Sequence, residues 1–356
     1  MKTCNVDRNC FSHLGYSVKI LRLDLSKLVR GLAATVCVLL AISINTLGAT
    51  IGVYDATTGA TVNADVVSGV QGTFGLAFSG ENLFIANFDA GSNTIGEYDA
   101  TTGTTVNAAL VSGLNAPFGL AEYGGNLFVT NFEVGNSNLG SIGVYNATSG
   151  ATVNSALVSG LWGPSGIAIS EGNIFVANTN SGTVGVYDAT TGAAVNSALI
   201  SGLTGPTGIA VSGGNIFVAY SGDRIGVYDA TTGATINAAL VTGLNNAYGI
   251  ALLEGNLYAT QFGNGTIGAY DSTTGATVNA ALVSGLSFPY GIGAYEGKLY
   301  VISQVPDTGS TAMLLGIGLV GLVGLGCLRD RPASGICFWG RNVIGGYRRP
   351  PIPAPR

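Results

Sequence analysis

Short apolar segments alternate with turns of glycine and small polar residues along most of this chain of 356 residues. The same pattern occurs six times in succession. The copies open at Ile51, Ile95, Ile142, Val184, Ile225 and Ile267. Their spacing of 41 to 47 residues is typical of a solenoid, a propeller or another array of like units.

Each copy contains four segments with the composition of short β-strands, as the copy that opens at Ile225 illustrates. Segment c is Ile225–Asp229 and segment d is Ala234–Leu244. Segments a and b lie on either side of a Glu-Gly-Asn turn within Gly249–Thr260. Glycine stands beside a small polar residue at each turn, as tight hairpins with positive φ require. The pattern therefore predicts four antiparallel strands in every copy.

The expected strands carry apolar side chains on both of their faces. In Leu127-Phe128-Val129, for example, neighbouring side chains point to opposite faces, yet all are hydrophobic. A sheet covered on both faces fits this pattern. Glycine within segment c, such as Gly52, is expected to let another backbone approach closely. Stacking of four-stranded sheets around an axis supplies such cover, so we predict an all-β, six-bladed β-propeller spanning residues 50–303.

The phase of the repeat predicts how the ring closes. The repeats begin at Ile51 with segments c and d, and they end at Gly291–Ser303 with segments a and b. If the order from the axis outward is a, b, c, d, one blade combines c and d from the N-terminal side with a and b from the C-terminal side. This closure would join the two ends of the ring.

Charge and side-chain chemistry exclude several classes of function. Between Ile51 and Ser303 there are 15 acidic residues and only two basic ones, Arg224 and Lys298. Nucleic acid is therefore not an expected partner, because binding to phosphate needs clustered lysine and arginine. All five cysteines and the one histidine, His13, lie outside the repeats. Disulfide frameworks, histidine metal sites and Ser-His-Asp triads are thus not expected in the propeller.

Residues 1–49 have the pattern of a secretory signal peptide. Basic residues up to Arg30 precede the largely apolar stretch 31–44, which is short for a membrane-spanning helix. We expect signal peptidase to cleave after Ala49. The alternative is an uncleaved membrane anchor.

The repeats resemble a known group of propellers. The stretch Pro206–Tyr220 (PTGIAVSGGNIFVAY) and the strand ends Phe175–Asn178 (FVAN) and Phe128–Asn131 (FVTN) are similar to NHL and YVTN-type repeats. Six copies favour the NHL or lactonase-like six-bladed group. The resemblance implies a propeller and includes both binding modules and enzymes, so it leaves function open.

The region 304–331 resembles the PEP-CTERM class of bacterial sorting signals, in its VPDSG variant. Its three parts occur in order: a short motif, the apolar stretch 311–328, and arginines. The resemblance implies a transmembrane helix over 311–328, cleavage by an exosortase-type protease, and delivery to the cell surface or extracellular matrix. A plain membrane anchor is the alternative, and residues 332–356 form a tail with no evident fold. The sorting residues are Val305, Pro306, Asp307, Thr308, Gly309, Arg329 and Arg331.

Comparison of the six copies predicts where a binding site would lie. The loops from c to d and from a to b hardly change, whereas those from b to c and from d to a vary, and they share one face. We expect aromatic residues to ring the axial opening there and amide residues to end the b strands, an arrangement suited to a carbohydrate or peptide. The alternative is that these side chains only pack the blade tops. The residues are Phe74, Phe118, Tyr248, Tyr290, Asn87, Asn131, Asn178 and Gln261.

The sequence assigns no catalytic residue, metal ligand or cofactor. Our prediction is an exported, surface- or matrix-associated, non-catalytic propeller that acts as a binding or structural module, with an extracellular glycan or protein as ligand. A metal-dependent hydrolase of the lactonase type is the alternative. That resemblance implies carboxylate and amide ligands in the axial channel, and a hard cation such as Ca²⁺ could use Asp89, Glu133 or Asp223.

Overall fold

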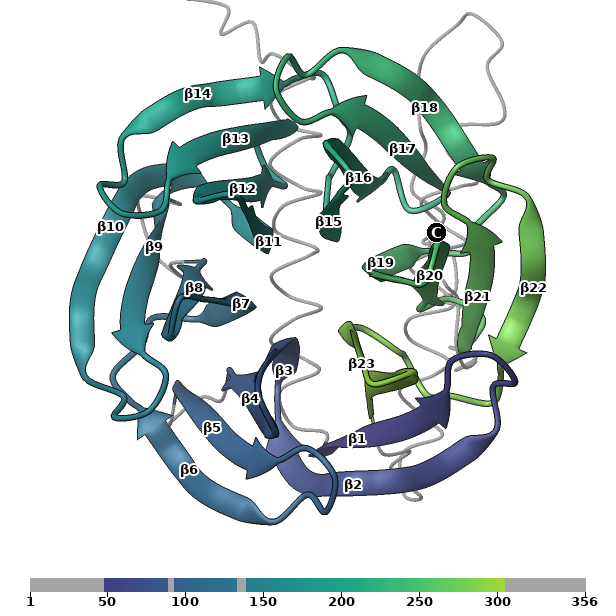
Figure 1. Cartoon of the computed structure of the whole chain (residues 1–356), viewed down its shortest axis with the longest axis horizontal. Coiled ribbons are helices and arrows are strands. Elements are labelled where there is room, and N and C mark those ends of the chain that lie inside the picture. The colour runs from purple at the N-terminus through teal and green to yellow at the C-terminus, as the bar shows by residue number, and fades with distance from the viewer. Residues whose placement is uncertain (1–47, 89–92, 133–138, 305–356) are drawn as a thin grey trace, which may run out of the picture. The chain divides into compact units, whose positions relative to one another are not determined.

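The computed structural model describes residues 48–88, 93–132 and 139–304, which form a ring of six four-stranded antiparallel blades (Figure 1). The predicted all-β, six-bladed propeller is therefore confirmed. Its first strand begins at Gly48, so the expected signal-peptide cleavage after Ala49 falls inside that strand. The last strand ends at Gln304.

The closing blade is built from both ends of the repeat region. From the axis outward its strands are β23 (Ile292–Tyr295), β24 (Lys298–Gln304), β1 (Gly48–Asp55) and β2 (Thr61–Gln71). The second blade contains β3 (Thr73–Ser79), β4 (Asn82–Asn87), β5 (Thr94–Asp99) and β6 (Thr105–Val111). The third contains β7 (Pro117–Tyr123), β8 (Asn126–Asn131), β9 (Leu139–Asn146) and β10 (Thr152–Trp162).

The other three blades repeat the same order of strands. The fourth contains β11 (Pro164–Ser170), β12 (Asn173–Asn178), β13 (Thr183–Asp188) and β14 (Ala194–Ile200). The fifth contains β15 (Ile209–Ser212), β16 (Asn215–Tyr220), β17 (Arg224–Asp229) and β18 (Thr235–Thr242). The sixth contains β19 (Ala247–Leu253), β20 (Asn256–Gln261), β21 (Thr266–Asp271) and β22 (Thr277–Val283).

The two chain ends pair as the phase of the repeat predicts. β1 runs antiparallel to β24 in an unbroken register from Ala49 opposite Gln304 to Asp55 opposite Lys298. Across the described ranges, no helix is long and apolar enough to cross a membrane. The stretches 31–44 and 311–328, and with them the predicted terminal helices, lie outside those ranges.

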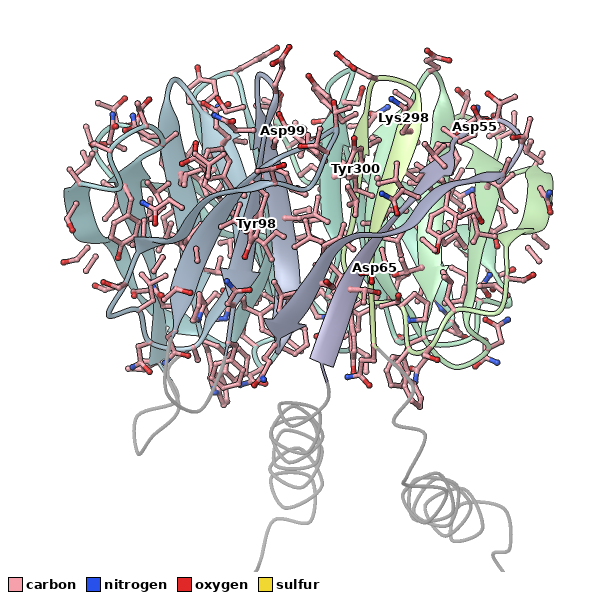
Figure 2. The ribbon with its side chains drawn as sticks, turned by 90° about the horizontal axis from the view of Figure 1, so that it is seen from below. Asp55, Asp65, Tyr98, Asp99, Lys298 and Tyr300 are labelled. Carbon is pink, nitrogen blue, oxygen red and sulfur yellow. The ribbon has the colours of Figure 1, made fainter. Side chains whose placement is uncertain are left out.

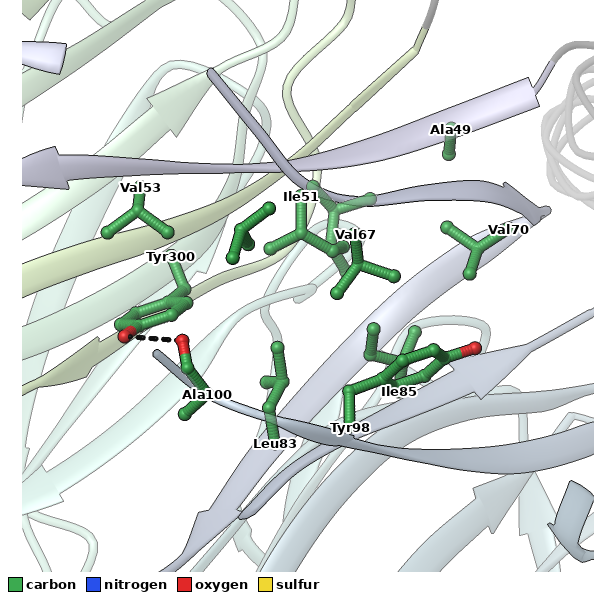
Figure 3. Packing of buried hydrophobic residues seen from close by; sticks show 12 residues of the cluster. Ala49, Ile51, Val53, Val67, Val70, Leu83, Ile85, Tyr98, Ala100 and Tyr300 are labelled. Carbon is green, nitrogen blue, oxygen red and sulfur yellow. Dashed lines mark hydrogen bonds between the residues drawn. The ribbon is translucent and has the colours of Figure 1, made fainter. Parts of the chain in front are cut away.

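Neighbouring blades pack through apolar side chains on both faces of each sheet. Between the closing blade and the second blade, Ile51 and Val67 meet Leu83 and Ile85, all at most 4% exposed (Figure 3). Five similar clusters lie at the other contacts between blades. The apolar character of both strand faces thus results from stacking of the blades.

Two sets of glycines permit close packing, but the expectation for Gly52 is wrong. A Cβ on Gly52 would lie 2.6 Å from the hydroxyl oxygen of Tyr54, the residue two positions on, whose ring shares its side of the strand. Backbones approach closely at the inner strands instead. A Cβ on Gly75 would lie 2.4 Å from the carbonyl oxygen of Phe118 in the next blade. The equivalent glycines are Gly119, Gly166, Gly208, Gly249 and Gly291.

Hydrogen bonds from two tyrosines join the closing blade to its neighbours on either side. The Tyr300 hydroxyl in β24 donates to the carbonyl oxygen of Ala100 in the second blade, at 3.0 Å (Figure 3). The Tyr258 hydroxyl in the sixth blade donates to the carbonyl oxygen of Ala56 in the closing blade, also at 3.0 Å. The other four blades carry phenylalanine at this position. The hydroxyls therefore occur only at the two contacts of the blade that is assembled from two chain ends.

Removing either hydroxyl should weaken the closure of the ring. We expect Tyr258→Phe and Tyr300→Phe each to lower the free energy of unfolding by about 1–2 kcal/mol, because a buried carbonyl loses its donor. Urea unfolding monitored by circular dichroism measures this change. Tyr187→Phe, within the fourth blade, is the control and should have a smaller effect. Equal losses in all three variants would contradict a special role for the closing blade.

One carboxyl group is buried between blades. Glu97 in β5 is 6% exposed and stands where the equivalent strands carry Val53, Val144, Val186, Val227 and Ala269. Loss of hydration raises the pKa of the Glu97 carboxyl above its ordinary value. The folded state therefore binds this proton more tightly than the unfolded state. The protonated Glu97 carboxyl therefore contributes fully to stability at pH values below its pKa in the unfolded chain. This contribution is lost as the pH rises through its pKa in the folded protein.

Glu97→Val should raise stability at neutral pH. We expect the free energy of unfolding at pH 7 to increase by about 1 kcal/mol, in the range typical of such substitutions, and the gain to shrink as the pH is lowered. Thermal unfolding between pH 3 and pH 8 measures both effects. Val227→Glu makes the reverse change in the fifth blade. It should lower the free energy of unfolding at pH 7, and this loss should also shrink as the pH is lowered. A gain that does not vary with pH would refute this account of Glu97.

Candidate functional site

The connections between strands separate onto two faces of the ring, as the comparison of the copies predicts. On the face that we call the turn face, the loops from a to b and from c to d contact each other. There the Ala100 amide donates to the Glu81 carbonyl at 2.8 Å. On the opposite, loop face, the Phe132 amide donates to the Ala116 carbonyl at 2.9 Å, which joins a b-to-c loop to a d-to-a loop.

The turn face carries most of the charge. Its aspartates hold the c-to-d turns: in the closing blade, Asp55 Oδ1 accepts hydrogen bonds from the Thr58 amide and hydroxyl, both at 2.7 Å. These bonds lower the pKa of the Asp55 carboxyl. Figure 2 shows Asp55, Asp99 and Lys298 together at this edge. The carboxylates of this face are Asp55, Glu81, Asp99, Glu122, Glu171, Asp188, Asp229, Glu254, Asp271 and Glu296.

Four predicted aromatic residues meet at the axial end of the loop face. Phe74 stacks on Phe118 with ring centroids 4.3 Å apart, and it contacts Tyr290 edge-on at 5.2 Å. Tyr248 completes the circuit, at 5.2 Å from Tyr290 and 6.2 Å from Phe118. We call these four rings the aromatic quartet. Because each ring touches two others, the quartet fills the axial end that the sequence led us to expect as an opening.

Further apolar side chains extend the quartet outward. Phe132 lies 6.1 Å from Phe118, and Phe262 lies 4.9 Å from Tyr290 and 4.8 Å from Phe288. These three partly exposed rings and the quartet form what we call the aromatic patch. At the loop-face end of the third blade, Leu139 pairs with Trp162 across β9 and β10. These two side chains are 45% and 52% exposed and form an apolar tip.

The inner strands line a small cavity that reaches the quartet. Its volume is about 120 Å³, and its walls are the quartet, the glycines and aliphatic side chains of the inner strands, and Thr207. The lining contains neither a carboxylate nor an amide side chain. Carboxylates are the charged ligands of hard cations in proteins, and none lines this space.

The predicted amide residues do end the b strands, but they turn away from the cavity. Asn87, Asn131, Asn178 and Gln261 are 3–8% exposed. The Gln261 Nε2 donates to the Ala280 carbonyl in β22 at 3.3 Å, so this side chain points outward within its own blade. Asn87 Nδ2 donates to Thr94 Oγ1 at 3.3 Å. The Oδ1 atoms of Asn87, Asn131 and Asn178 are buried and have no hydrogen-bond partner among the described residues.

The acids considered for a metal site are not gathered into one. Asp223 forms a two-pronged ion pair with the adjacent Arg224, at 2.8 and 2.9 Å, which lowers the pKa of the Asp223 carboxyl. Asp89 and Glu133 lie outside the described residues. Within the described ranges, no group of three or more His, Cys, Asp or Glu side chains is placed to hold a metal ion.

One residue of the patch, Phe288, has a backbone conformation that its side chain disfavours. In every blade, one residue precedes the inner-strand glycine, and in four blades this residue belongs to the quartet. The residue two positions before it has a left-handed backbone conformation in all six blades. Three blades use glycine there, and the others use Ala116, Asn246 and Phe288, with φ of 51°, 58° and 47°. For a residue with a Cβ this conformation costs about 1–2 kcal/mol. The sequence prediction missed Phe132, Phe262, Phe288 and the apolar tip, although alignment of the copies shows phenylalanine where others have glycine.

Comparisons with known proteins identify the fold. Neither protein-family profiles nor curated proteins match the sequence. A chain in a crystal structure of a nidogen/laminin complex aligns with a TM-score of 0.55 and 15% identity, over 72% of this chain and 98% of that one. A gluconolactonase from Xanthomonas campestris aligns with a TM-score of 0.51 and 13% identity, over 65% and 86% of the two chains. At such identities the likeness shows a shared six-bladed propeller fold alone.

Proposed function

We propose that this chain is an exported, non-catalytic interaction module whose working surface is the aromatic patch on the loop face. The observation that carries the proposal is Phe288, a bulky aromatic residue in a left-handed conformation for which three of the other copies use glycine. Backbone strain of this kind is concentrated at functional sites. Selection for the ring itself explains why the less strained residue is not used.

The chemistry of the patch supports binding to a partner. Aromatic side chains present rigid apolar area with little conformational entropy to lose, and they dominate the energetics of many interfaces. The chain with a TM-score of 0.55 comes from a structure of a protein–protein complex. The lactonase resemblance implies carboxylate and amide ligands in the axial channel, and neither kind of side chain lines the cavity.

Phe288→Gly should separate stability from binding. We expect the free energy of unfolding to rise or stay unchanged, because glycine adopts the left-handed conformation without strain. Binding to partners captured on an array of glycans and peptides should fall about tenfold or more, as for an interface hot spot. Ala116→Gly relaxes the same backbone position in the third blade without removing a ring, and its binding should match that of the wild type. Unchanged capture by Phe288→Gly would refute the proposal.

We propose further that the chain is delivered to the cell surface or extracellular matrix through the motif Val305–Gly309 and the apolar stretch 311–328. Mass spectrometry of surface-located protein should find a mature form that ends near this motif. Replacing Pro306 by alanine should leave the form that retains residues 311–328. If surface protein from the wild type retains the apolar stretch, sorting by cleavage is wrong and a permanent anchor takes its place.

A further inference from the structure

We infer that, in the form of the chain that still carries residues 311–328, the partner of the aromatic patch and the apolar tip is the interfacial region of a lipid membrane, to which this segment would hold the loop face. This inference rests on the proposed function, because it names the partner of the same surface. Three independent features carry it: the place where both chain ends leave the ring, the distribution of charge, and the kinds of side chain that the loop face exposes.

Both ends of the propeller leave from the loop face, next to each other. Gly48 begins β1 and Gln304 ends β24, and these strands pair so that Ala49 lies opposite Gln304. Strands c begin and strands b end at the loop face in every blade. The chain therefore enters and leaves the ring on the side that carries the aromatic patch.

The sequence beyond Gln304 keeps the loop face close to any membrane that it enters. The apolar stretch 311–328 begins after only six residues, 305–310. Six residues span at most about 20 Å when fully extended. A segment that crossed a bilayer at 311–328 would thus hold the aromatic face within this distance of the lipid surface.

The distribution of charge favours the same orientation. The turn face carries ten carboxylates and one ammonium, that of Lys298. On the loop face, the part that the structure describes carries the ion pair of Asp223 and Arg224. The intervening loops 89–92 and 133–138 add one carboxylate each, Asp89 and Glu133. Six-residue strands separate the faces by about 20 Å, which is twice the screening length of about 10 Å, so the acidic face is held away from anionic lipid.

The exposed side chains of the loop face are of the type found at membrane interfaces. Tryptophan, tyrosine and phenylalanine combine an apolar ring with tolerance of the polar head-group region. Trp162, with Leu139, stands at the end of the third blade, and Phe132 lies between this tip and the quartet. Phe262 lies on the other side of the axis, where it follows β20 of the sixth blade. A tether raises the effective concentration of the face at the membrane, so a weak intrinsic affinity is sufficient.

Trp162 provides a direct test in the full-length chain. The chain contains one other tryptophan, Trp339, which Trp339→Phe removes. This variant is reconstituted into vesicles of phosphatidylcholine and phosphatidylglycerol that contain lipids brominated near the head group. We expect the emission of Trp162 to fall about twofold, since the apolar tip reaches the interfacial region. The control carries Trp162→Phe, Trp339→Phe and Thr231→Trp, which moves the fluorophore to an exposed turn on the opposite face, and it should not be quenched.

The outcomes separate this inference from the proposed function. Quenching of Trp162 alone, also in vesicles without phosphatidylglycerol, supports docking of the loop face on lipid. Equal quenching of both fluorophores, or quenching of neither, overturns it. If Trp162 is not quenched while capture of a glycan or peptide depends on Phe288, the lipid inference is wrong and the proposed function stands. If capture is also independent of Phe288, both are wrong.

Discussion

Pairing of β1 with β24 is the interaction on which the rest of the ring depends. A propeller holds its inner strands around the axis only if the last blade contacts the first. Here that blade is assembled from two ends of the chain that are about 250 residues apart, through seven paired positions from Ala49 to Asp55. The entropy of closing so long a loop has to be offset by this register and by the apolar clusters on both sides of the blade. The two tyrosine hydroxyls add polar contacts at those same junctions.

Closure also determines what can occupy the axis. Glycine in each inner strand brings that strand against a carbonyl group of its neighbour, as Gly75 is brought against Phe118. Little room is left for side chains along the channel, and the residue before each glycine fills its loop-face end. In four blades that residue is aromatic, whereas Ser165 and Thr207 stand at the other two positions. The quartet is therefore asymmetric on a nearly symmetric frame, and loop-face residues distinguish one blade from another.

Much of this architecture follows from the sequence because the same pattern is repeated six times. The number of blades, the order of strands and the joining of the ends all follow from the phase of the copies. The direction of the amide side chains was harder to foresee. Asn87 shares its side of β4 with Leu83 and Ile85, because side chains alternate along a strand, and so it faces the interior of the stack. Contacts across the axis, such as that between Phe118 and Tyr248, depend on the diameter of the closed ring and have no local signal in the sequence.

The way the ring closes determines on which of its two faces the chain ends lie. A ring joined between strands c and b must release both ends on the face where b ends and c begins, whatever the residues on that face. The turn face has no chain end, and its aspartates serve the turns that hold strands c and d together. Half of the carboxylates on that face, its five aspartates, come from this turn chemistry, and the loop face is left to the residues that vary among blades. The topology thus places both chain ends on the loop face, whereas the aromatic character of that face comes from the residues that vary among blades. The aromatic face is therefore the one at which β1 begins and β24 ends, and the more highly charged face is the one opposite.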